Sequence, residues 1–185
     1  MTDGTRETHR VEVAGLTREL PLFEVAPGVR IAVLNILGDA EVVAASAAEL
    51  AKRLEGIEHD ALVTAETKSV PLVYHLALVS GKPWVVLRKA YKPYMGAAIS
   101  ATTNSITTGA PQTLHLDQKD QALVRGKRVV LVDDVISTGS TVEGMRELMD
   151  SVDATVVAQA AIFTEGDERD DVVALGHLPV FTASE

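Results

Sequence analysis

The stretch Val129 to Thr141 reads VVLVDDVISTGST and joins three kinds of residue in one run. Its first four residues are apolar and have the composition of a buried strand. Asp133 and Asp134 follow at once, and a loop of Ser, Thr and Gly then leads into a helical pattern. Small loop residues let backbone N–H groups converge on an anion, and a helix N-terminus attracts negative charge. The stretch therefore predicts a strand, a loop and a helix, with an anion site beside two carboxylates.

The two carboxylates repel an anion, so they are expected to bind a different part of the same ligand. A carboxylate accepts hydrogen bonds from the hydroxyls of a diol. A phosphorylated sugar carries both a diol, which the two carboxylates can bind, and a phosphate, which the loop can bind. The simpler interpretation is that the acidic pair ends a strand and that Thr138 or Ser140 caps the next helix. A Walker A loop is excluded because no Gly-Lys-Ser/Thr follows.

The rest of the chain alternates between strand-like and helix-like segments, which predicts an α/β fold with a mainly parallel, twisted sheet flanked by helices. Strands are expected at Val29–Leu34, Ala61–Ala65, Trp84–Leu87, Val129–Val132 and Ala154–Phe163, and helices at 40–56 after an Asp39 N-cap, at Val70–Val79 before Gly81, and at Thr141–Met149. A hairpin is expected from Ile99–Thr108 and Gln112–Leu116, with its turn at 109–111. The chain contains no repeat or linker, so residues 1–185 are expected to form a single domain.

Composition narrows the class of protein. The 17 basic and 26 acidic residues give a net charge of −9, which argues against binding to nucleic acid or to an anionic membrane. The absence of cysteine excludes disulfides and thiolate chemistry. The N-terminal segment lacks the apolar region of a secretory signal, and no apolar run reaches transmembrane length. A soluble protein of the cytoplasm is expected.

The run at Val129–Thr141 resembles the signature of the type I phosphoribosyltransferases for phosphoribosyl pyrophosphate (PRPP): an apolar strand, two acidic residues and a T-G-[ST]-T loop. The resemblance implies a hood that includes about residues 1–35, and a β-hairpin lid. It also implies transfer of ribose 5-phosphate from PRPP to a base, with Mg²⁺ held mainly by PRPP and not directly by the protein. By match, Asp133 and Asp134 take the ribose hydroxyls. The implied phosphate-binding residues are Ser137, Thr138, Gly139, Ser140 and Thr141.

A second segment extends the resemblance. ETKSV, at 66–70 after ALVTA, is similar to the pyrophosphate loop of adenine enzymes (E-S-R-G-F) and of xanthine enzymes (E-A-S-G-I). The resemblance implies pyrophosphate binding by Glu66, Thr67, Lys68 and Ser69, and a non-proline cis peptide in this loop. Lys68 stands where adenine enzymes have Arg, so the charge is kept and the bidentate fork is lost. Ser69 replaces a Gly, which puts the backbone conformation of the loop in question.

A third segment, WVVLRKAYKPYMG at 84–96, resembles the strand and basic pair that lead into the mobile loop of the family. Arg88 and Lys89 are expected to face the pyrophosphate, and Lys89 is grouped with Asp133 and Asp134 as catalytic. Such loops close over the reactants and exclude water. The expected lid residues are Tyr91, Lys92 and Tyr94.

The base is the least constrained part of the site. Adenine enzymes typically carry the motif S-x-L-E-Y-G in the hairpin after the lid. In this chain Thr107 occupies the position of the Glu, and the segment around it is similar to the S-F-T segment of xanthine enzymes. Asn35 resembles an Asn that xanthine enzymes use on the base, and Phe23 and Val135 are further expected base contacts. The segments LPLFEVAPGVRI and HLPVF are adenine-like.

We therefore expect an adenine-type purine phosphoribosyltransferase of nucleotide salvage. A xanthine or 6-oxopurine enzyme, a pyrimidine enzyme and a non-catalytic PRPP-sensing regulator are the alternatives. Such regulators carry a DNA-binding domain before this fold, and fewer than thirty residues precede the first expected strand at Val29. The regulator is therefore the less favoured expectation. The expected partners are PRPP, a nucleobase and, because the family is commonly dimeric, a second copy of the chain.

Overall fold

The core is a five-stranded parallel sheet in a computed structural model that describes residues 7–103 and 112–182. Its strand order is β10-β9-β8-β4-β5, and every neighbouring pair is parallel. The strands are β4 (Ala61–Ala65), β5 (Trp84–Leu87), β8 (Arg128–Ile136), β9 (Thr155–Glu165) and β10 (Val172–Leu178). The α/β fold with a mainly parallel sheet is confirmed.

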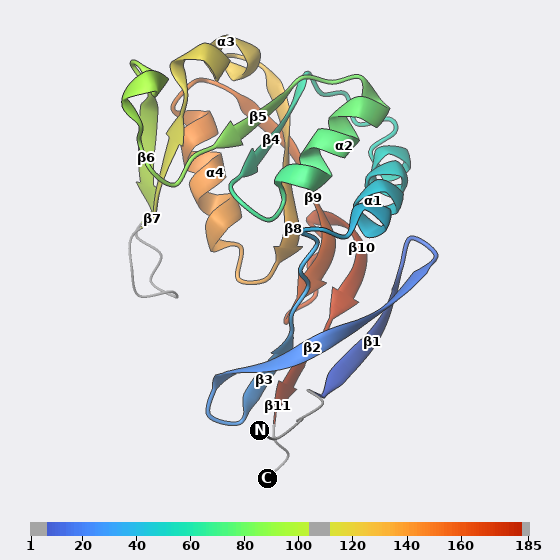
Figure 1. Cartoon of the computed structure of the whole chain (residues 1–185). Helices are drawn as coiled ribbons and strands as arrows, with labels where there is room; N and C mark the ends of the chain where they lie inside the picture. Colours follow the sequence, from blue (N-terminus) through green and yellow to red (C-terminus); the bar gives the residue numbers. More distant parts are fainter. Residues whose placement is uncertain (1–6, 104–111, 183–185) are drawn as a thin grey trace.

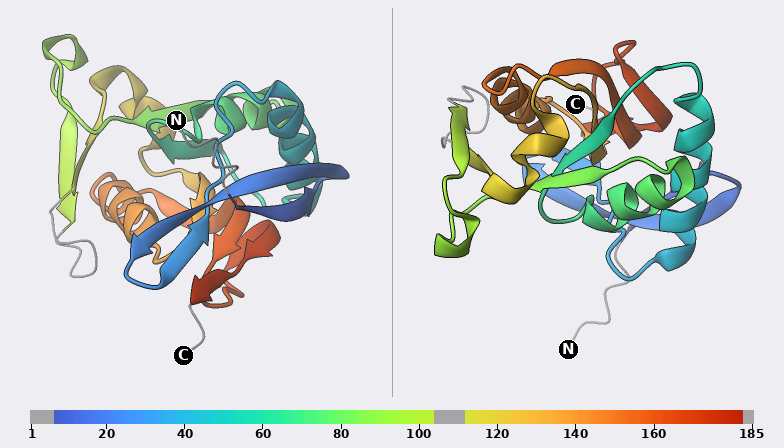
Figure 2. Two further views of the ribbon diagram at one scale, coloured as in Figure 1. Left: turned by 60° about the horizontal axis from the view of Figure 1, so that its bottom comes forward. Right: turned by 90° about the horizontal axis from the view of Figure 1, so that it is seen from above.

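Helices cover both faces of this sheet (Figure 1; Figure 2, right). One face is covered by α1 (Ala40–Arg53) and α2 (Val70–Ser80). The other is covered by α4 (Ser140–Asp150) with the hairpin of β6 (Ile99–Thr103) and β7 (Gln112–Leu116). The connections contain the short helices η1 (Pro93–Met95), η2 (Gln118–Asp120) and α3 (Gln121–Val124). Side chains alternate across a strand, so each face has its own core. Leu62 packs with the α1 and α2 cluster, whereas Ala61 and Val63 pack with the α4 cluster.

A second, antiparallel sheet forms the hood, in the order β1-β2-β3-β11. Its strands are β1 (Thr8–Val13), β2 (Leu16–Ala26), β3 (Val29–Ala32) and β11 (Val180–Thr182). The expectation that the first strand begins at Val29 is wrong, because the hairpin β1–β2 precedes it. Val11 and Val13 alternate with exposed Arg10 and Glu12, a period-2 pattern that the sequence displays and that predicts a half-buried strand.

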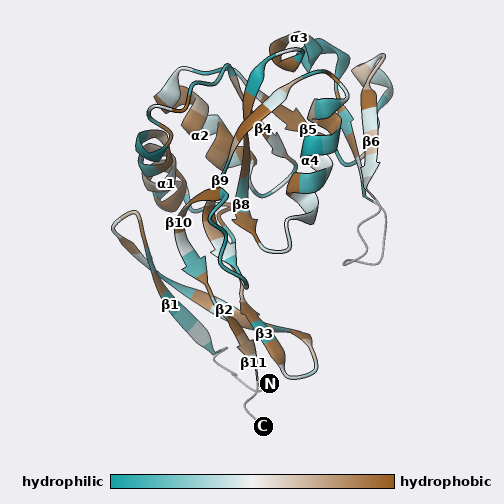
Figure 3. Ribbon diagram, turned by 180° about the vertical axis from the view of Figure 1, so that it is seen from behind, coloured by the Kyte–Doolittle hydropathy of each residue, from teal (hydrophilic) through white to brown (hydrophobic). Residues whose placement is uncertain are grey.

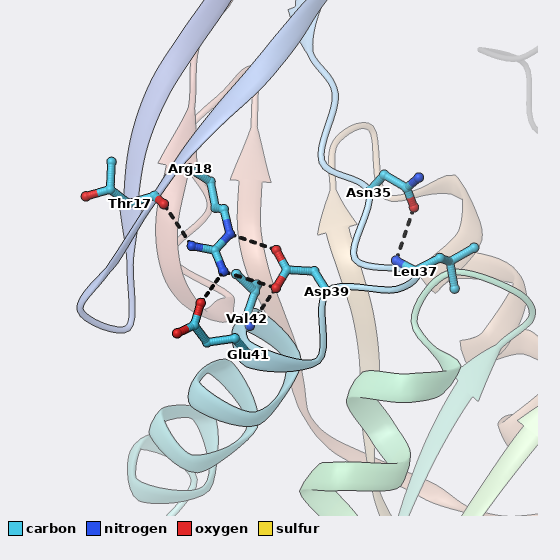
Figure 4. A network of polar contacts seen from close by, with 7 residues as sticks. All are labelled: Thr17, Arg18, Asn35, Leu37, Asp39, Glu41 and Val42. Atoms are coloured by element: carbon cyan, nitrogen blue, oxygen red, sulfur yellow. Dashed lines mark hydrogen bonds and ion pairs between the residues drawn. The ribbon is translucent and has the colours of Figure 1, made fainter.

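Arg18 connects the hood to the core (Figure 4). Its Nε and Nη2 donate to the Asp39 carboxylate at 2.7 and 3.1 Å, and Nη2 also donates to Glu41 at 2.6 Å. The predicted N-cap is confirmed, since Asp39 Oδ1 accepts from the backbone N–H of Val42 at 3.1 Å. The hydrogen bond from Arg18 lowers the pKa of Asp39. One carboxylate therefore begins α1 and holds the β1–β2 hairpin against it.

Several predicted boundaries were wrong in informative ways. β8 continues to Ile136, so Asp133 and Asp134 lie inside the strand instead of after it. α4 begins at Ser140 with Gly139 as its N-cap, and neither Thr138 nor Ser140 caps it. Of the predicted strand Ile99–Thr108, the structure describes Ile99–Thr103, which form β6; residues 104–111, with Thr107 and the predicted turn at 109–111, lie outside the described residues. The predicted end of α2 is confirmed, because Gly81 adopts the left-handed conformation with φ of 67°.

Four strands were not predicted, β1, β2, β10 and β11; the segment that leads from Glu165 into β10 is short and rich in acidic residues. α2 differs from the other helices in being apolar around most of its circumference (Figure 3). Tyr74, Leu78 and Val79 are the large apolar residues that it exposes. Among the described residues, no helix is both long and apolar enough to cross a membrane.

Candidate functional site

The acidic pair lies at the carboxyl end of β8, the edge of an open parallel sheet at which ligands bind. Asp133 is half-buried and Asp134 is 5% exposed. The backbone N–H of Asp134 donates to Oδ1 of Asp133 at 2.9 Å. Burial, and next the negative charge of Asp134, raise the pKa of the Asp133 carboxyl to about 7. The pair is therefore held in a place where two negative charges are costly without a ligand or a cation.

The loop after β8 forms a small cradle of about 100 Å³, lined by Ser137 to Thr141 with Asp133. Gly139 has φ of 83°, a left-handed conformation that residues with a side chain rarely adopt. It begins α4 without a side-chain cap, so the N–H groups of the first turn keep their capacity to bind an anion. Thr138 Oγ1 donates to Ser140 Oγ at 3.4 Å. The cradle has the donors and the helix field that a phosphate requires.

The predicted pyrophosphate segment folds into the loop between β4 and α2, and the peptide bond between Glu66 and Thr67 is cis. Glu66 joins this loop to the basic pair: its Oε2 accepts from Nε of Arg88 at 2.6 Å, and its Oε1 accepts from the backbone N–H of Lys89 at 2.6 Å. The hydrogen bond that Arg88 donates to Glu66 raises the pKa of Arg88. The Glu66 carboxylate thus holds two cationic segments together.

Lys68 reaches the acidic pair from the same loop. Its Nζ lies 3.1 Å from Oδ2 of Asp134, with side-chain exposures of 50% and 7%. The contact is an ion pair outside hydrogen-bond geometry, so Oδ2 accepts no hydrogen bond within the described part of the chain. The predicted pyrophosphate segment and the acidic pair are therefore adjacent.

Ser69 belongs to the same segment, and its hydroxyl is turned inward. The residue is 1% exposed, and its Oγ donates to the carbonyl of Ala65 at 3.1 Å and lies 2.7 Å from Oγ1 of Thr64. Thr64 Oγ1 also donates to the carbonyl of Val132 at 2.7 Å. These buried hydroxyls tie the loop to β4 and β8. The contacts of Thr64 were not predicted, because nothing in the sequence distinguishes a Thr within a buried strand from an ordinary core residue.

A cleft of about 330 Å³ brings the predicted segments together. Its lining residues are Ala65, Glu66, Thr67, Lys68, Ser69, Lys89, Asp133, Asp134, Val135 and Thr141. A larger cavity of about 400 Å³ lies between α1 and α2, and its lining includes none of these residues. The charged residues of that cavity are Lys52, Glu55 and Lys82, whereas the 330 Å³ cleft combines the acidic pair and Glu66 with Lys68 and Lys89, and shares Thr141 with the cradle. The cleft is the stronger candidate site.

The expected lid residues follow the basic pair around η1. Tyr91 Oη donates to the carbonyl of Gly96 at 3.2 Å, and Arg88 Nη1 lies 3.5 Å from Oη of Tyr94, whose side chain is 71% exposed. Lys92 is the N-cap of η1 and is exposed. These side chains lie outside the 330 Å³ cleft.

The expected base contacts lie apart from one another. Val135 lines the cleft, but neither Phe23 nor Asn35 does. Phe23 is on β2 of the hood and is 56% exposed. Asn35 follows β3, and its Oδ1 accepts from the backbone N–H of Leu37 at 3.2 Å (Figure 4). The hood lies beyond the carboxyl end of β8 (Figure 1), so both residues are on the side of the molecule where the sheet ends.

Comparison with known proteins decides the family. The model of the phosphoribosyl transferase domain matches residues 33–175, which include the cleft, the cradle and the basic pair. The chain belongs to the phosphoribosyl transferase domain family. The match leaves the β1–β2 hairpin of the hood outside it, so the shared part of this domain is the parallel core with its loops.

Two groups of relatives share this phosphoribosyl transferase domain. The adenine phosphoribosyltransferase of Butyrivibrio fibrisolvens is 31% identical over 146 residues, 78% of this chain and 78% of that protein. The purine biosynthesis transcriptional repressor PurR of Bacillus subtilis is 28% identical over 160 residues, 86% of this chain. The chain spans 55% of the length of that repressor. The domain therefore occurs both in transferases and in a longer regulator.

Solved structures show the same fold. Adenine phosphoribosyltransferase from Thermoanaerobacter pseudethanolicus superposes with a TM-score of 0.65 at 22% identity, covering 92% of this chain and 95% of that one. The enzyme of Trypanosoma brucei, solved with AMP, pyrophosphate and ribose 5-phosphate, gives a TM-score of 0.59 at 22% identity over 77% of this chain and 67% of that one. The type I phosphoribosyltransferase fold expected from the sequence is confirmed.

Proposed function

We propose that this protein transfers ribose 5-phosphate from PRPP to a purine base, with adenine as the first candidate, and releases pyrophosphate. The observation that carries the proposal is the contact between Lys68 and Asp134, because it joins the loop proposed for pyrophosphate to the pair proposed for the ribose. The cradle at Ser137–Thr141 adjoins the same pair and is proposed to bind the 5′-phosphate.

The proposed reaction breaks the bond between C1 of the ribose and the pyrophosphate oxygen, and forms a bond from C1 to a ring nitrogen of the base. The departing oxygen keeps the electron pair of the broken bond, and the ring nitrogen loses its proton to solvent or to pyrophosphate. Lys68, Arg88 and Lys89 stabilise the negative charge that develops on the pyrophosphate. Asp133 and Asp134 hold the ribose hydroxyls, and their negative charge stabilises the ribosyl cation. Most of the catalysis is thus positioning and electrostatics.

Magnesium fits this site as a companion of the substrate. No group of three or more His, Cys, Asp or Glu side chains in residues 7–103 and 112–182 forms a ready metal cage. Mg²⁺ keeps most of its water and binds phosphates readily. We therefore propose that it would be held mainly by PRPP, near the Asp133 and Asp134 carboxylates. It would neutralise the leaving group.

The decisive experiment is incubation of the full chain with PRPP, Mg²⁺ and each of adenine, hypoxanthine, guanine, xanthine, orotate and uracil. Product formation tests catalysis and identifies the base. The double substitution Asp133→Asn with Asp134→Asn is expected to abolish turnover and to leave the fold intact. Asp150→Asn, at the exposed end of α4, is the matched control for the loss of a carboxylate. Full turnover by the double variant would show that the site is wrongly assigned.

Two observations bear on the base. Adenine enzymes among the relatives favour adenine, and they cover most of this chain. Thr107 at the Glu position favours xanthine or another 6-oxopurine, and a pyrimidine enzyme is the remaining alternative. A single product from the panel of bases distinguishes these cases.

A second function is supported by the match to PurR of Bacillus subtilis, which extends over 86% of this chain. In this alternative the cleft binds PRPP and the protein acts as a sensor. Binding of PRPP, measured by calorimetry, with no product from any base would favour it. Product formation with one base would favour the transferase.

We also propose that the chain forms a homodimer through the outer face of α2 and works in the cytoplasm. Tyr74, Leu78 and Val79 expose 49%, 61% and 49% of their surface, and they share this helix with the buried Leu72 and Leu76. Side chains of this size favour a protein partner over water. Sedimentation of the wild type and of Leu78→Lys tests the dimer, since the variant is expected to sediment as a monomer.

A further inference from the structure

A second pocket adjoins the cradle and has no part in the proposed transfer. Its volume is about 260 Å³, and its lining includes Thr138, Gly139, Arg146, Gln159, Arg169 and Asp171. Thr138 and Gly139 also line the cradle, so the two sites share a wall. The other residues come from α4, from β9 and from the connection between β9 and β10. We call it the second pocket.

Arg146 gives this pocket an unneutralised positive charge. It is half-buried on α4, and it forms no ion pair or hydrogen bond with any residue that the structure describes. Arg169 differs, because its Nε and Nη2 donate to the Asp171 carboxylate at 2.8 and 2.9 Å. Glu143 also lines the pocket, but its side chain is exposed and makes no ion pair with Arg146. A half-buried guanidinium with five donors and no acceptor is suited to an anion.

Gln159 places a second requirement on a ligand of this pocket, a hydrogen-bond donor. It lies on β9 and is 7% exposed, and its Nε2 donates to Oδ2 of Asp171 at 3.2 Å. The acceptor on Asp171 fixes the orientation of the amide, because only the nitrogen end carries hydrogens. Oε1 then points elsewhere and has no hydrogen-bond partner among the described residues. A buried carbonyl oxygen without a donor is costly, and a ligand that brings an O–H or N–H group removes the cost.

We propose that the second pocket binds a small anion that carries its own hydrogen-bond donor, such as hydrogen phosphate or a phosphorylated or carboxylated compound with a hydroxyl group. The anion would accept from Arg146, and its hydroxyl would donate to Oε1 of Gln159. Sulfate has the same charge and shape as hydrogen phosphate and carries no proton at neutral pH, so it leaves Oε1 unpaired.

The shared wall connects this pocket to the cradle. A ligand in the second pocket contacts Thr138 and Gly139 from a side different from the one that lines the cradle, and it therefore biases the conformation of the phosphate loop. An anionic metabolite bound in the second pocket would therefore change the affinity of the protein for PRPP. Only this coupling rests on the proposed function; the binding itself does not.

The test compares inorganic phosphate with sulfate on the full chain, at pH 7.5 and constant ionic strength. Phenylglyoxal modifies accessible arginines, and mass spectrometry of peptides reports the rate at each one. Phosphate is expected to protect Arg146 at a concentration about tenfold below that of sulfate, the factor for one buried hydrogen bond. Arg125 is the internal control: it is exposed on another element and is expected to react equally in both anions.

Two variants separate this pocket from the cradle. Gln159→Met is expected to remove the preference for phosphate over sulfate, whereas Thr141→Ala, on the cradle only, is expected to leave it unchanged. The comparison of anions on the wild type needs no variant, so it decides even where Gln159→Met unfolds. Equal protection by both anions, or none by phosphate, would overturn the proposal. Absence of transferase activity would leave the footprint result standing.

Discussion

Nζ of Lys68, on the loop between β4 and α2, lies 3.1 Å from Oδ2 of Asp134 on β8, and the two residues are 66 positions apart in the chain. The lysine side chain is half exposed and the aspartate side chain is buried, so solvent contacts this ion pair mainly at the lysine. In the proposed reaction the ribose hydroxyls take over the carboxylates, and Lys68 turns to the pyrophosphate. The same ammonium group thus neutralises the acidic pair before the substrate binds and the leaving group afterwards.

Replacing Lys68 by Gln is expected to raise the KM for PRPP by about ten- to a hundredfold, the range for a lost charge-assisted hydrogen bond. Steady-state kinetics with saturating base measures this change. Lys68→Arg keeps the charge, so it is expected to lose much less. An unchanged KM with a lowered Tm in Lys68→Gln would mean that Lys68 only neutralises Asp134.

The acidic pair is expected to make the unliganded protein less stable as pH rises. Asp133 has a pKa of about 7 in the folded protein, against an ordinary value of 3.8, so the folded state holds the proton more tightly than the unfolded state. Between about pH 4 and pH 7 the free energy of unfolding therefore falls with pH, and above pH 7 the full cost remains.

Urea unfolding of the wild type and of Asp133→Asn across this range measures the effect. The amide keeps Oδ1 as an acceptor for the N–H of Asp134 and carries no charge. The variant is expected to be the more stable protein at pH 8 and to match the wild type near pH 4. Asp134→Asn is expected to reduce the fall of the free energy of unfolding with pH, since it removes the negative charge next to Asp133. Parallel curves for wild type and Asp133→Asn would contradict the raised pKa.

Phe23 provides a test of the base site. Its ring is 56% exposed on the hood, where removal leaves no cavity in the core. If it stacks on the base, Phe23→Ala is expected to raise the KM for the base about tenfold, with the KM for PRPP unchanged. Val25→Ala, 52% exposed on the same strand, is the control. Equal KM values for the base in wild type and Phe23→Ala would remove Phe23 from the site.

The parallel core and the cradle were predictable because each is local in the sequence. Val129 to Val132 is a continuous apolar run, as expected for a strand buried on both faces, and the Gly of the cradle follows within ten residues. The acidic pair was placed after the strand because carboxylates are poor strand formers. In the structure the ladder with β9 continues through Asp133 to Ile136 and overrides that preference.

Long-range contacts account for most of what the sequence could not predict. Glu66 bonds Arg88 and Lys89, and Thr64 bonds Val132, through hydrogen bonds between residues 22 to 68 positions apart. No spacing rule predicts such partners. β11 pairs with β3 across almost the whole chain, so its three residues have no local signal. Arg146 and Gln159 were missed for the same reason, since they meet only when α4 packs on β9.

Gly139→Ala is the sharpest test of the cradle. The residue has φ of 83°, where a side chain costs about 1 to 2 kcal/mol. A Cβ there would also lie 2.9 Å from Nη1 of Arg169, whose guanidinium is held by Asp171. Gly126 has φ of 66° and no atom within 4 Å of its Cβ position, so Gly126→Ala carries the backbone cost alone.

Both variants are expected to lower Tm by about 2 to 8 °C in thermal denaturation, because the backbone cost is common to them. Only Gly139→Ala is expected to raise the KM for PRPP, by more than about tenfold, since the displaced loop no longer directs its N–H groups at the phosphate. Adding Arg169→Ala to Gly139→Ala removes the steric conflict and is expected to recover part of the lost affinity. An equal rise in KM for Gly126→Ala would show that the loss comes from general destabilisation and not from the shape of the cradle.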